Sequence, residues 1–328
     1  MSWSTRALDA LDALAAGPPT RLIDFPVRVP GVRLLLKDES GHPTGSLRHR
    51  HARALFRRAV LDGSITEGTT VVEAAGGNAA VAQAWFARRL GLPYVVIMPG
   101  APDPARARPV EALGGECRFV TPPLAIYDAA QEAARAVGGH YLDQFGRATP
   151  HDLAEELFAQ VRPDWVVTGA ATGATSATLG AAAGEHGCRV AVADPDNSAY
   201  FPGWTLDVPD YATGMPSRIE GIGRPRVEPG FRPELVDLVV PVPDAAGVAA
   251  ARHLREVTGL PVGGSSGTAL WAALELAGRM RARGERGTIV SLVGDAAERH
   301  LATYHDDAWA AGKGLDVAGR LTELRQRV

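Results

Sequence analysis

Short apolar runs alternate with longer amphipathic segments through most of this 328-residue chain. The apolar runs have the length of strands and are rich in Val and Ile at successive positions, which is typical of parallel strands buried on both faces. The segments between them are rich in Ala, Leu and Arg and have the length of helices. The alternation therefore predicts an α/β fold in which open, mainly parallel sheets are flanked by helices.

The predicted strands are 32–37, 70–73, 94–98, 117–120, 165–168, 189–193 and 288–293, and the predicted helices include 79–90, 104–113, 126–136 and 176–185. Three segments are predicted to be long loops, namely 144–150, 197–229 and the tail after Asp307. The first twenty residues predict a helix that ends at Gly17-Pro18-Pro19 and packs on a neighbouring domain or subunit.

Composition places the chain among ordinary globular proteins, with 46% hydrophobic and 22% charged residues. The net charge of −3 argues against a nucleic-acid-binding surface, and no apolar stretch approaches the ~20 residues that span a bilayer. No signal peptide is apparent at the N-terminus, so we expect a cytoplasmic protein. Cys117 and Cys188 are then expected to be buried thiols, and no His/Cys cluster has the spacing of metal ligands.

The segment Pro43-Thr44-Gly45-Ser46-Leu47-Arg48 follows a strand-like run that ends in Lys37-Asp38-Glu39. This order resembles the segment that carries the Schiff-base lysine in the cysteine synthase branch of the fold-type-II pyridoxal-phosphate (PLP) enzymes. The resemblance extends from about Thr20 to about Leu315 and is particularly close to the bacterial cysteine desulfhydrase subgroup. Its other landmarks are 68–74, 86–88, 139–145, 217–225, 262–268 and 303–307.

The resemblance implies a tryptophan synthase β-like architecture of two domains, each with an open parallel sheet flanked by helices. The predicted smaller domain is 46–150, and the predicted larger domain is 1–45 together with 151–328. The resemblance also implies an active-site cleft between the domains and a homodimer.

Position 48 departs from the family pattern, because it holds arginine where the resemblance calls for the lysine that bonds to PLP. A guanidinium group stays protonated and is a poor nucleophile, so it cannot replace a lysine amine in that bond. The chain has only two lysines, Lys37 and Lys313, and neither is expected to substitute. Because arginine outnumbers lysine throughout the chain, drift remains an alternative explanation for Arg48 taken alone.

Two loops that the resemblance assigns to ligands are also altered. The phosphate loop, Gly-Thr-Gly-Gly-Thr in the family, reads Ala171-Thr172-Gly173-Ala174-Thr175. Methyl groups at the two alanines can block a close approach of the backbone or a positive φ. The loop for the substrate carboxylate, Ser-Ser-Gly-Asn-Thr in the family, reads Ala75-Gly76-Gly77-Asn78-Ala79 and lacks hydroxyl donors. Backbone amides could still bind an anion in both loops.

A third motif, Asp-Ser-Gly-Glu in the family, reads Asp295-Ala296-Ala297-Glu298 and lacks the hydroxyl that the resemblance places against the pyridine nitrogen. Each change alone agrees with tolerated variation. Together with Arg48 they affect the contacts to the aldehyde, the phosphate, the ring and the substrate carboxylate. The combination predicts that the cofactor site has been lost while the fold has been kept.

Arg48 and His49 are the predicted catalytic residues. Arg48 can bind a carboxylate or phosphate through two parallel hydrogen bonds, and His49 can act as an acid or base near neutral pH. A histidine also follows the lysine in the desulfhydrase-like relatives, so a structural role for His49 is the alternative. His51 is expected at the surface or in an interface. Ser265 and Ser266 begin a predicted helix, where they donate hydrogen bonds to a ligand or form an N-cap.

Three functions agree with these observations. The first is a protein without a cofactor whose emptied cleft binds a different small, anionic molecule, either to transform it or only to hold it. The second is an inactive paralogue with a structural or regulatory role. The third is a lyase for amino acids such as cysteine that binds PLP without a covalent bond. The sequence favours the first, with no nucleic-acid, membrane or metal partner, and Arg48→Lys alone is not expected to restore full activity.

Overall fold

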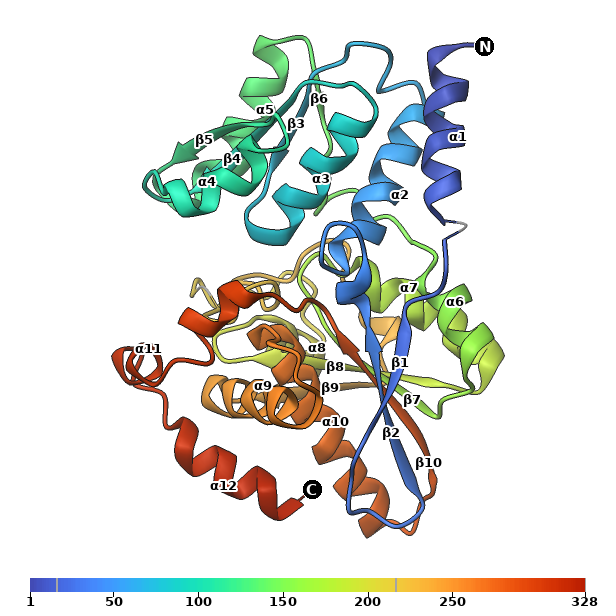
Figure 1. Ribbon diagram of the computed structural model, residues 1–328, viewed down its shortest axis with the longest axis vertical. Helices are drawn as coiled ribbons and strands as arrows, with labels where there is room; N and C mark the ends of the chain where they lie inside the picture. Colours follow the sequence, from blue (N-terminus) through green and yellow to red (C-terminus); the bar gives the residue numbers. More distant parts are fainter. Residues whose placement is uncertain (16, 216, 328) are drawn as a thin grey trace. The chain divides into compact units, whose positions relative to one another are not determined.

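The computed structural model describes residues 1–15, 17–215 and 217–327, which form two compact units (Figure 1). Unit 1 comprises residues 1–19 and 48–151, and unit 2 comprises residues 20–47 and 152–328. Each unit has its own β-sheet, built mainly from parallel strands and packed against helices. The predicted α/β architecture is therefore confirmed.

Unit 1 is built on a four-stranded parallel sheet in the order β5-β4-β3-β6. Alternate residues of a strand face opposite sides of the sheet, so Val96 and Met98 of β4 pack in one cluster with Phe86, whereas Ile97 packs with Ile126 on the other face. Burial on both faces explains the continuous apolar runs. The elements are α1 (Trp3–Ala15), α2 (Arg48–Leu61), β3 (Val71–Ala74), α3 (Gly77–Arg89), β4 (Tyr94–Pro99), α4 (Pro104–Glu111), β5 (Glu116–Val120), η2 (Pro123–Ala125), α5 (Ile126–Ala136) and β6 (His140–Tyr141).

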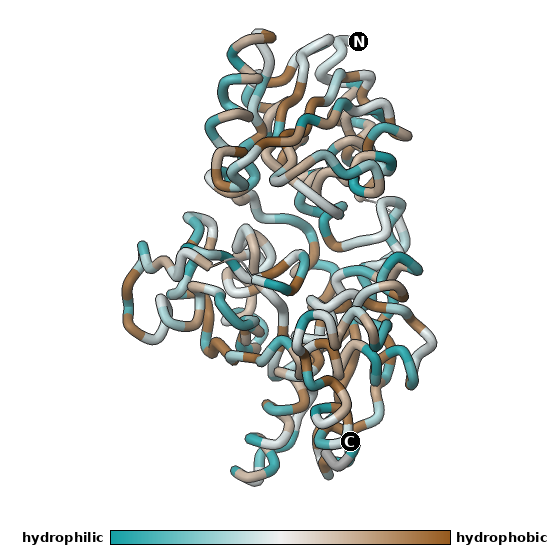
Figure 2. The backbone as a smooth tube through the Cα atoms, turned by 90° about the vertical axis from the view of Figure 1, so that its left-hand side faces the viewer, coloured by the Kyte–Doolittle hydropathy of each residue, from teal (hydrophilic) through white to brown (hydrophobic). Residues whose placement is uncertain are grey.

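Unit 2 is built on a six-stranded sheet in the order β1-β2-β10-β7-β8-β9. β1 pairs antiparallel with β2, and the other neighbouring strands are parallel. The strands are β1 (Arg21–Phe25), β2 (Val32–Asp38), β7 (Trp165–Gly169), β8 (Arg189–Pro195), β9 (Leu238–Val242) and β10 (Gly287–Val293). Figure 2 shows stretches of hydrophobic residues, coloured brown, in the interior of this unit and of unit 1.

Helices pack on both faces of the sheet of unit 2. Residues of α6 and α7 form one apolar cluster with alternate strand residues, and residues of α9 and α10 form the other. The helices are α6 (Leu153–Gln160), α7 (Ala174–Ala183), α8 (Tyr200–Leu206), α9 (Asp244–Thr258), α10 (Gly264–Ala282), α11 (Asp307–Gly312) and α12 (Val317–Arg327), with shorter 3-10 helices η1 (Glu39–Gly41), η3 (Gly184–His186), η4 (Pro233–Leu235) and η5 (Glu298–Ala302).

The predicted strands and the four predicted helices are all present, and their ends differ from the prediction by no more than two residues. The loop at 144–150 contains no helix or strand, as predicted. The other two predicted loops are wrong in part, because 197–229 contains α8 and the tail contains α11 and α12. The tail is helical because its apolar residues Val317, Leu321 and Leu324 recur at helical spacing and pack on unit 2.

The first nineteen residues belong to unit 1, whereas the sequence analysis assigned them to the larger domain. The predicted N-terminal helix is present as α1, and it lies beside α2 (Figure 1). Ala7 and Leu11 of α1 are buried in the core of unit 1, and Asp12 forms an ion pair with Arg57 at 2.7 Å. These contacts account for the assignment.

The two cysteines are free thiols, of which Cys188 is buried and Cys117 is half-buried. Burial raises the pKa of Cys188 to about 12, so this side chain behaves as a small apolar group. The α-helices of the described residues lack the combination of length and apolar character that crossing a bilayer requires.

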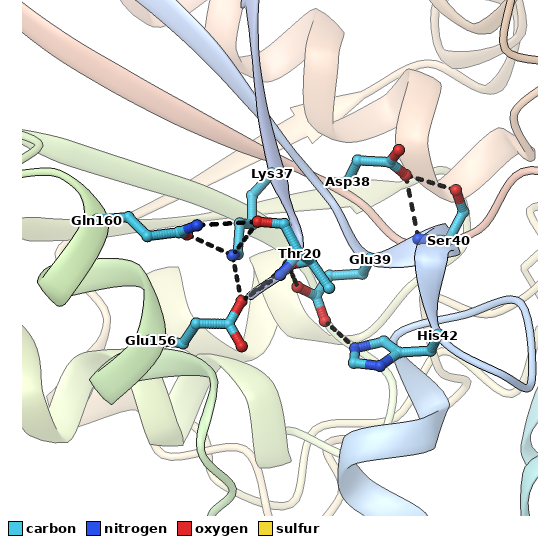
Figure 3. A network of polar contacts seen from close by, with 8 residues as sticks. All are labelled: Thr20, Lys37, Asp38, Glu39, Ser40, His42, Glu156 and Gln160. Atoms are coloured by element: carbon cyan, nitrogen blue, oxygen red, sulfur yellow. Dashed lines mark hydrogen bonds and ion pairs between the residues drawn. The ribbon is translucent and has the colours of Figure 1, made fainter. Parts of the chain in front are cut away.

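A buried polar network connects the start of β1, the strand β2 and the helix α6 (Figure 3). The ammonium group of Lys37 is fully buried and donates to the Thr20 carbonyl at 2.9 Å, to Gln160 Oε1 and to the carboxylate of Glu156. An ammonium group has three N–H donors, so each of them has an acceptor. The Thr20 hydroxyl extends the network to the buried carboxylate of Glu39 at 2.7 Å.

We expect Glu156→Gln to destabilise the protein by roughly 3–5 kcal/mol, because the buried Lys37 charge would lose its carboxylate partner. The matched control is Glu275→Gln on α10, which removes a surface carboxylate paired with Arg279 at 2.7 Å and should change the stability by less than about 1 kcal/mol. Urea unfolding of the three proteins measures both values. Equal effects of the two substitutions would show that the network contributes no more than a surface ion pair.

Candidate functional site

The loops that follow the parallel strands of unit 2 gather at one edge of its sheet. β10 pairs in parallel with both β2 and β7, so the carboxyl ends of the three strands lie side by side. Ligands of open α/β sheets bind at such edges. The segments at this edge include Ser46-Leu47 after β2 and η1, Thr172-Gly173 after β7, and Ala296 after β10. The structure therefore brings together several residues predicted as a site, from positions far apart in the chain.

The loop Ala171–Thr175 keeps the backbone form of an anion-binding turn. Gly173 has φ +83° and caps the N-terminus of α7, and a Cβ added there would clash with the backbone of Gly230 and Phe231. The buried hydroxyl of Thr172 accepts a hydrogen bond from the Ala174 amide at 3.3 Å. The first turn of a helix presents N–H groups without intrahelical partners, and these groups attract anions.

Neither alanine of this loop has positive φ, so that part of the expected effect is absent, whereas a blocked approach of the backbone to a ligand stays a prediction. Positive φ within the loop falls on Gly173, and neither Ala171 nor Ala174 is among the described residues with positive φ. The Ala174 side chain is 2% exposed, so its methyl group packs inside the protein. The replacement of glycine at 171 and 174 therefore leaves the backbone of the turn intact.

The end of β10 is fixed by backbone contacts to two other loops. The Leu47 amide donates to the Gly294 carbonyl at 2.8 Å, and the Gly294 amide donates to Ser266 Oγ at 3.0 Å. Ala296 forms a β-bridge with Val262, which precedes α10. The buried hydroxyl of Ser266 thus supports the loop, in agreement with the structural alternative, whereas Ser265 is half-buried and its role as a ligand donor stays a prediction.

Ser46 lies at the centre of these contacts. Its main chain forms a β-bridge with Asp295, and its side chain is fully buried. Among the described residues, Ser46 Oγ has no hydrogen-bond partner. Buried hydroxyl groups normally have one, so this oxygen is available to a bound group at the same edge of the sheet.

The loop Ala75–Asn78 connects β3 to α3 in unit 1. Gly76 is the extended N-cap of α3, and Gly77 has φ +52°. The guanidinium group of Arg106 on α4 borders this loop, because a Cβ at Gly76 would lie 3.2 Å from Arg106 Nη2. A hydrogen bond to the Pro99 carbonyl (2.8 Å) and the ring of Phe119 hold the guanidinium there.

Arg106 was missed in the sequence analysis. It lies on a different helix from the loop that it borders, and no local pattern around it differs from that of a surface arginine. Its guanidinium adds a positive charge next to the N-terminus of α3, where helix amides also favour anions. The loop therefore lacks hydroxyl donors and has a cationic neighbour.

Glu73 is buried directly before this loop. Its carboxylate accepts hydrogen bonds from the amides of Ala74 at 2.8 Å and Gln144 at 3.1 Å, and from the Gln83 side chain at 3.3 Å. Burial raises the pKa of Glu73 to about 8, although these hydrogen bonds oppose the change. The side chain is thus protonated at neutral pH and links β3 to the 143–144 turn.

The predicted catalytic pair lies at the start of α2. Arg48 is half-buried at the first residue of this helix. His49 is buried against aromatic rings, with centroid distances of 4.7 Å to Phe86 and 5.2 Å to Trp85. This packing supports the structural alternative for His49, and catalytic roles for both residues stay predictions.

His51 is buried, so its predicted surface position is wrong. The helix α2 is covered on this side by the segment 149–151, where the Thr149 amide donates to His51 Nε2 at 3.4 Å and the His151 ring lies 6.5 Å away. Burial lowers the pKa of His51 well below its ordinary value, and the charges of His151 and Arg48 lower it further. His51 is therefore neutral at physiological pH.

Neither lysine lies in the loops of the candidate site. Lys37 uses its donors in the network with Thr20, Glu156 and Gln160. Lys313 is exposed in the turn that follows α11. The expectation that neither replaces the lysine that the family pattern calls for at position 48 stays a prediction.

We expect Gly173→Ala to destabilise the protein by roughly 2–4 kcal/mol, because the alanine would have positive φ and would clash with the backbone at Gly230. Gly184→Ala, at the other end of α7, is the control, since Gly184 has φ −60° and open space around it. The control should be neutral or stabilising by up to about 1 kcal/mol. Chemical denaturation measures the difference, and a stable Gly173→Ala protein would contradict the described turn.

We expect the stability to fall as the pH rises from 6.5 to 8. In this range the folded state keeps the proton of Glu73 (pKa about 8), whereas the unfolded chain (ordinary pKa 4.5) has released it. The slope is at most about 1.4 kcal/mol per pH unit for one group. His51, whose pKa is lowered, acts in the opposite direction only below its ordinary pKa of 6.5. Urea unfolding at several pH values should show the slope in the native protein and its absence in Glu73→Gln.

Comparison with known proteins supports a single family. The sequence model of that family, described as pyridoxal-phosphate dependent enzyme, matches residues 14–295. The chain is 44% identical to the L-cysteine desulfhydrase Cds1 of Mycobacterium tuberculosis over 98% of this chain and 94% of that protein. It is 31% identical to a putative cysteine synthase of Sinorhizobium fredii, over 90% of each.

A solved structure, the crystal structure of O-ureido-L-serine synthase, has the same fold with a TM-score of 0.76 and 25% identity, and the match covers 93% of this chain and 98% of that one. The sheets flanked by helices, the extent of the match and the identity to curated relatives agree with one another. The chain belongs to the pyridoxal-phosphate dependent enzyme family, in its branch of cysteine synthase-like and cysteine desulfhydrase-like proteins.

Proposed function

We propose that this protein is a slow lyase for cysteine or a related amino acid with a leaving group on Cβ, and that it holds PLP without a covalent bond. One observation carries this proposal: the turn Ala171–Thr175 keeps the backbone of an anion site, while position 48 has no amine. The 44% identity to a protein named L-cysteine desulfhydrase supports the choice of substrate class.

The residues of the phosphate turn fit the group. Gly173 is the N-cap of α7 with φ +83°, and the methyl group of Ala174 is buried. Thr175 is half-buried at the same helix start. A phosphate bound here would accept hydrogen bonds from main-chain N–H groups, which do not depend on the side chains that have changed.

The covalent link does not fit, because the lysines lie elsewhere and Arg48 keeps its proton. PLP, when bound, supplies an electron sink for negative charge at Cα of an amino acid. The residues of this chain would then bind and orient the substrate. The amides of Gly77 and Asn78 and the guanidinium of Arg106 favour the substrate carboxylate. Arg48 cannot accept the Cα proton, and we therefore expect slow turnover.

A second candidate is a binding protein or enzyme for a different small, anionic molecule, without PLP. The arginines support it, because Arg106 is a permanent cation beside the loop 75–78 and Arg48 is a permanent cation at a position predicted to bind a carboxylate or phosphate. The methyl group of Ala296, which offers no hydrogen bond to a pyridine nitrogen, supports it as well. In either case we also propose the homodimer that the family resemblance implies, which light scattering on the purified protein tests.

We expect the native protein to bind added PLP and to lose it on dialysis, with slow release of sulfide and pyruvate from L-cysteine. Arg48→Lys should retain PLP through dialysis and increase sulfide release by at least about a hundredfold, since a lysine amine adds general-base catalysis. Full activity is not expected, because Ala296 still lacks a hydroxyl.

The control variant is Arg58→Lys, which makes the same change at an exposed position of α2 and should behave as the native protein. The readouts are the visible absorbance of the dialysed proteins and sulfide release. If native protein and Arg48→Lys both fail to bind PLP at millimolar concentration, the lyase proposal is wrong. Stabilisation of the native protein by small carboxylates or phosphates alone would then favour the second candidate.

A further inference from the structure

A cavity of about 280 Å³ lies within unit 2, outside the loops of the candidate site. It is formed by the segment before Gly221, by the first residue of α9, and by the chain from Thr303 to Leu315. Sites for drug-sized ligands start at ~300 Å³, so this cavity suits a molecule as small as an amino acid. The residues that bear on its chemistry are Arg218, Glu220, Asp244, Tyr304, Trp309 and Lys313.

Asp244 is the buried acceptor of this cavity. Its side chain is fully buried, and Oδ2 accepts a hydrogen bond from Arg218 Nε at 2.7 Å. Within the described part of the chain, Oδ1 is buried and has no hydrogen-bond partner. A buried carboxylate oxygen normally has a donor, and a ligand ammonium group would supply one.

Lys313 supplies the cavity with a positive charge that is not already paired with a carboxylate of the described residues. The guanidinium of Arg218 is already paired with Asp244, and Glu220 is paired with Arg299 at 3.2 Å. Lys313 is exposed, and no ion pair of its ammonium group occurs among residues 1–15, 17–215 and 217–327. A ligand carboxylate would therefore meet a positive charge that protein carboxylates do not neutralise.

The remaining wall is apolar. Trp309 and Tyr304 pack edge to face with ring centroids 5.1 Å apart, and both line the cavity together with Leu315. An aliphatic group would bury apolar surface against these rings. The cavity thus combines an acceptor, a cation and an apolar wall.

We propose that this cavity binds the zwitterion of a small aliphatic amino acid. Its ammonium group donates to Asp244, its carboxylate pairs with Lys313, and its side chain packs on Trp309. The cavity lies outside the candidate site, and two contacts connect its lining to residues next to that site. Tyr304 packs against Gly264, next to Ser265, because a Cβ at Gly264 would lie 2.8 Å from the tyrosine ring. Arg299 also contacts both Glu220 and Asp295.

The test is isothermal titration of the full chain with L-leucine, with 3-methylbutylamine, which lacks the carboxylate, and with 4-methylpentanoate, which lacks the ammonium group. We expect leucine to bind more tightly than either analogue. Lys313→Gln should weaken leucine about tenfold, the effect of one charged hydrogen bond, and should leave the amine unchanged. Arg281→Gln, which removes an exposed charge on α10, is the control and should change nothing.

Asp244→Asn should weaken both leucine and the amine, provided that its thermal unfolding shows a folded protein. If it does not fold, Lys313→Gln still decides, because Lys313 is exposed. No binding of leucine at millimolar concentration would overturn the proposal. Equal affinities of native protein and Lys313→Gln would also overturn it. Neither result depends on PLP binding, so failure of this proposal can be distinguished from failure of the lyase proposal.

Discussion

The position of β10 between β2 and β7 is the constraint on which the candidate site of unit 2 depends. Because both pairings are parallel, the segments that follow the three strands leave the sheet at one edge. The pairing continues beyond the strand, through the bond from the Leu47 amide to Gly294 and the bond from the Gly294 amide to Ser266. The loops of the site are thus held by a main-chain contact between Leu47 and Gly294 and by the side-chain hydroxyl of Ser266, and the main-chain contact is insensitive to many side-chain changes.

The altered motifs differ in whether their function depends on the main chain or on a side chain. At 171 and 174 the family glycines have become alanines, but the turn needs positive φ only at Gly173, which is retained. Those two changes therefore leave the backbone of the turn intact, and the effect of their methyl groups on phosphate binding stays a prediction. Position 48 is different, because the chemistry of the missing lysine lies in its side chain and no backbone contact can supply an amine. Among the altered motifs, Arg48 is therefore the residue on which the proposal of non-covalent PLP binding depends most.

The sequence predicted elements well where the local pattern and the packing agree, as in the strands 94–98 and 288–293, which are apolar because both faces are covered. It failed for elements too short to show a periodic pattern and for contacts between residues that are far apart in the chain. β6 has two residues, too few for any period, and Arg106 reaches Gly76 from another helix. The burial of His51 depends on the segment 149–151, which no spacing within α2 reveals. By contrast, the spacing of Val317, Leu321 and Leu324 could have predicted α12.

The two lysines show what a compact ammonium group does that a guanidinium group does not. Nearly all of the 34 basic Lys and Arg residues of this chain are arginines, so a lysine stands out wherever it occurs. At position 37 the reason is geometric, because three acceptors surround one buried nitrogen, whereas the planar guanidinium spreads its donors over a wider fork. In the described part of the chain, Lys313 has no such network. It lines a cavity in which Asp244 Oδ1 has no donor among the described residues, and a compact ammonium group on a flexible stem there can pair with the carboxylate of a small ligand. At Lys37 the acceptors of the ammonium group come from the protein, and at Lys313 the proposed acceptor is the carboxylate of the ligand.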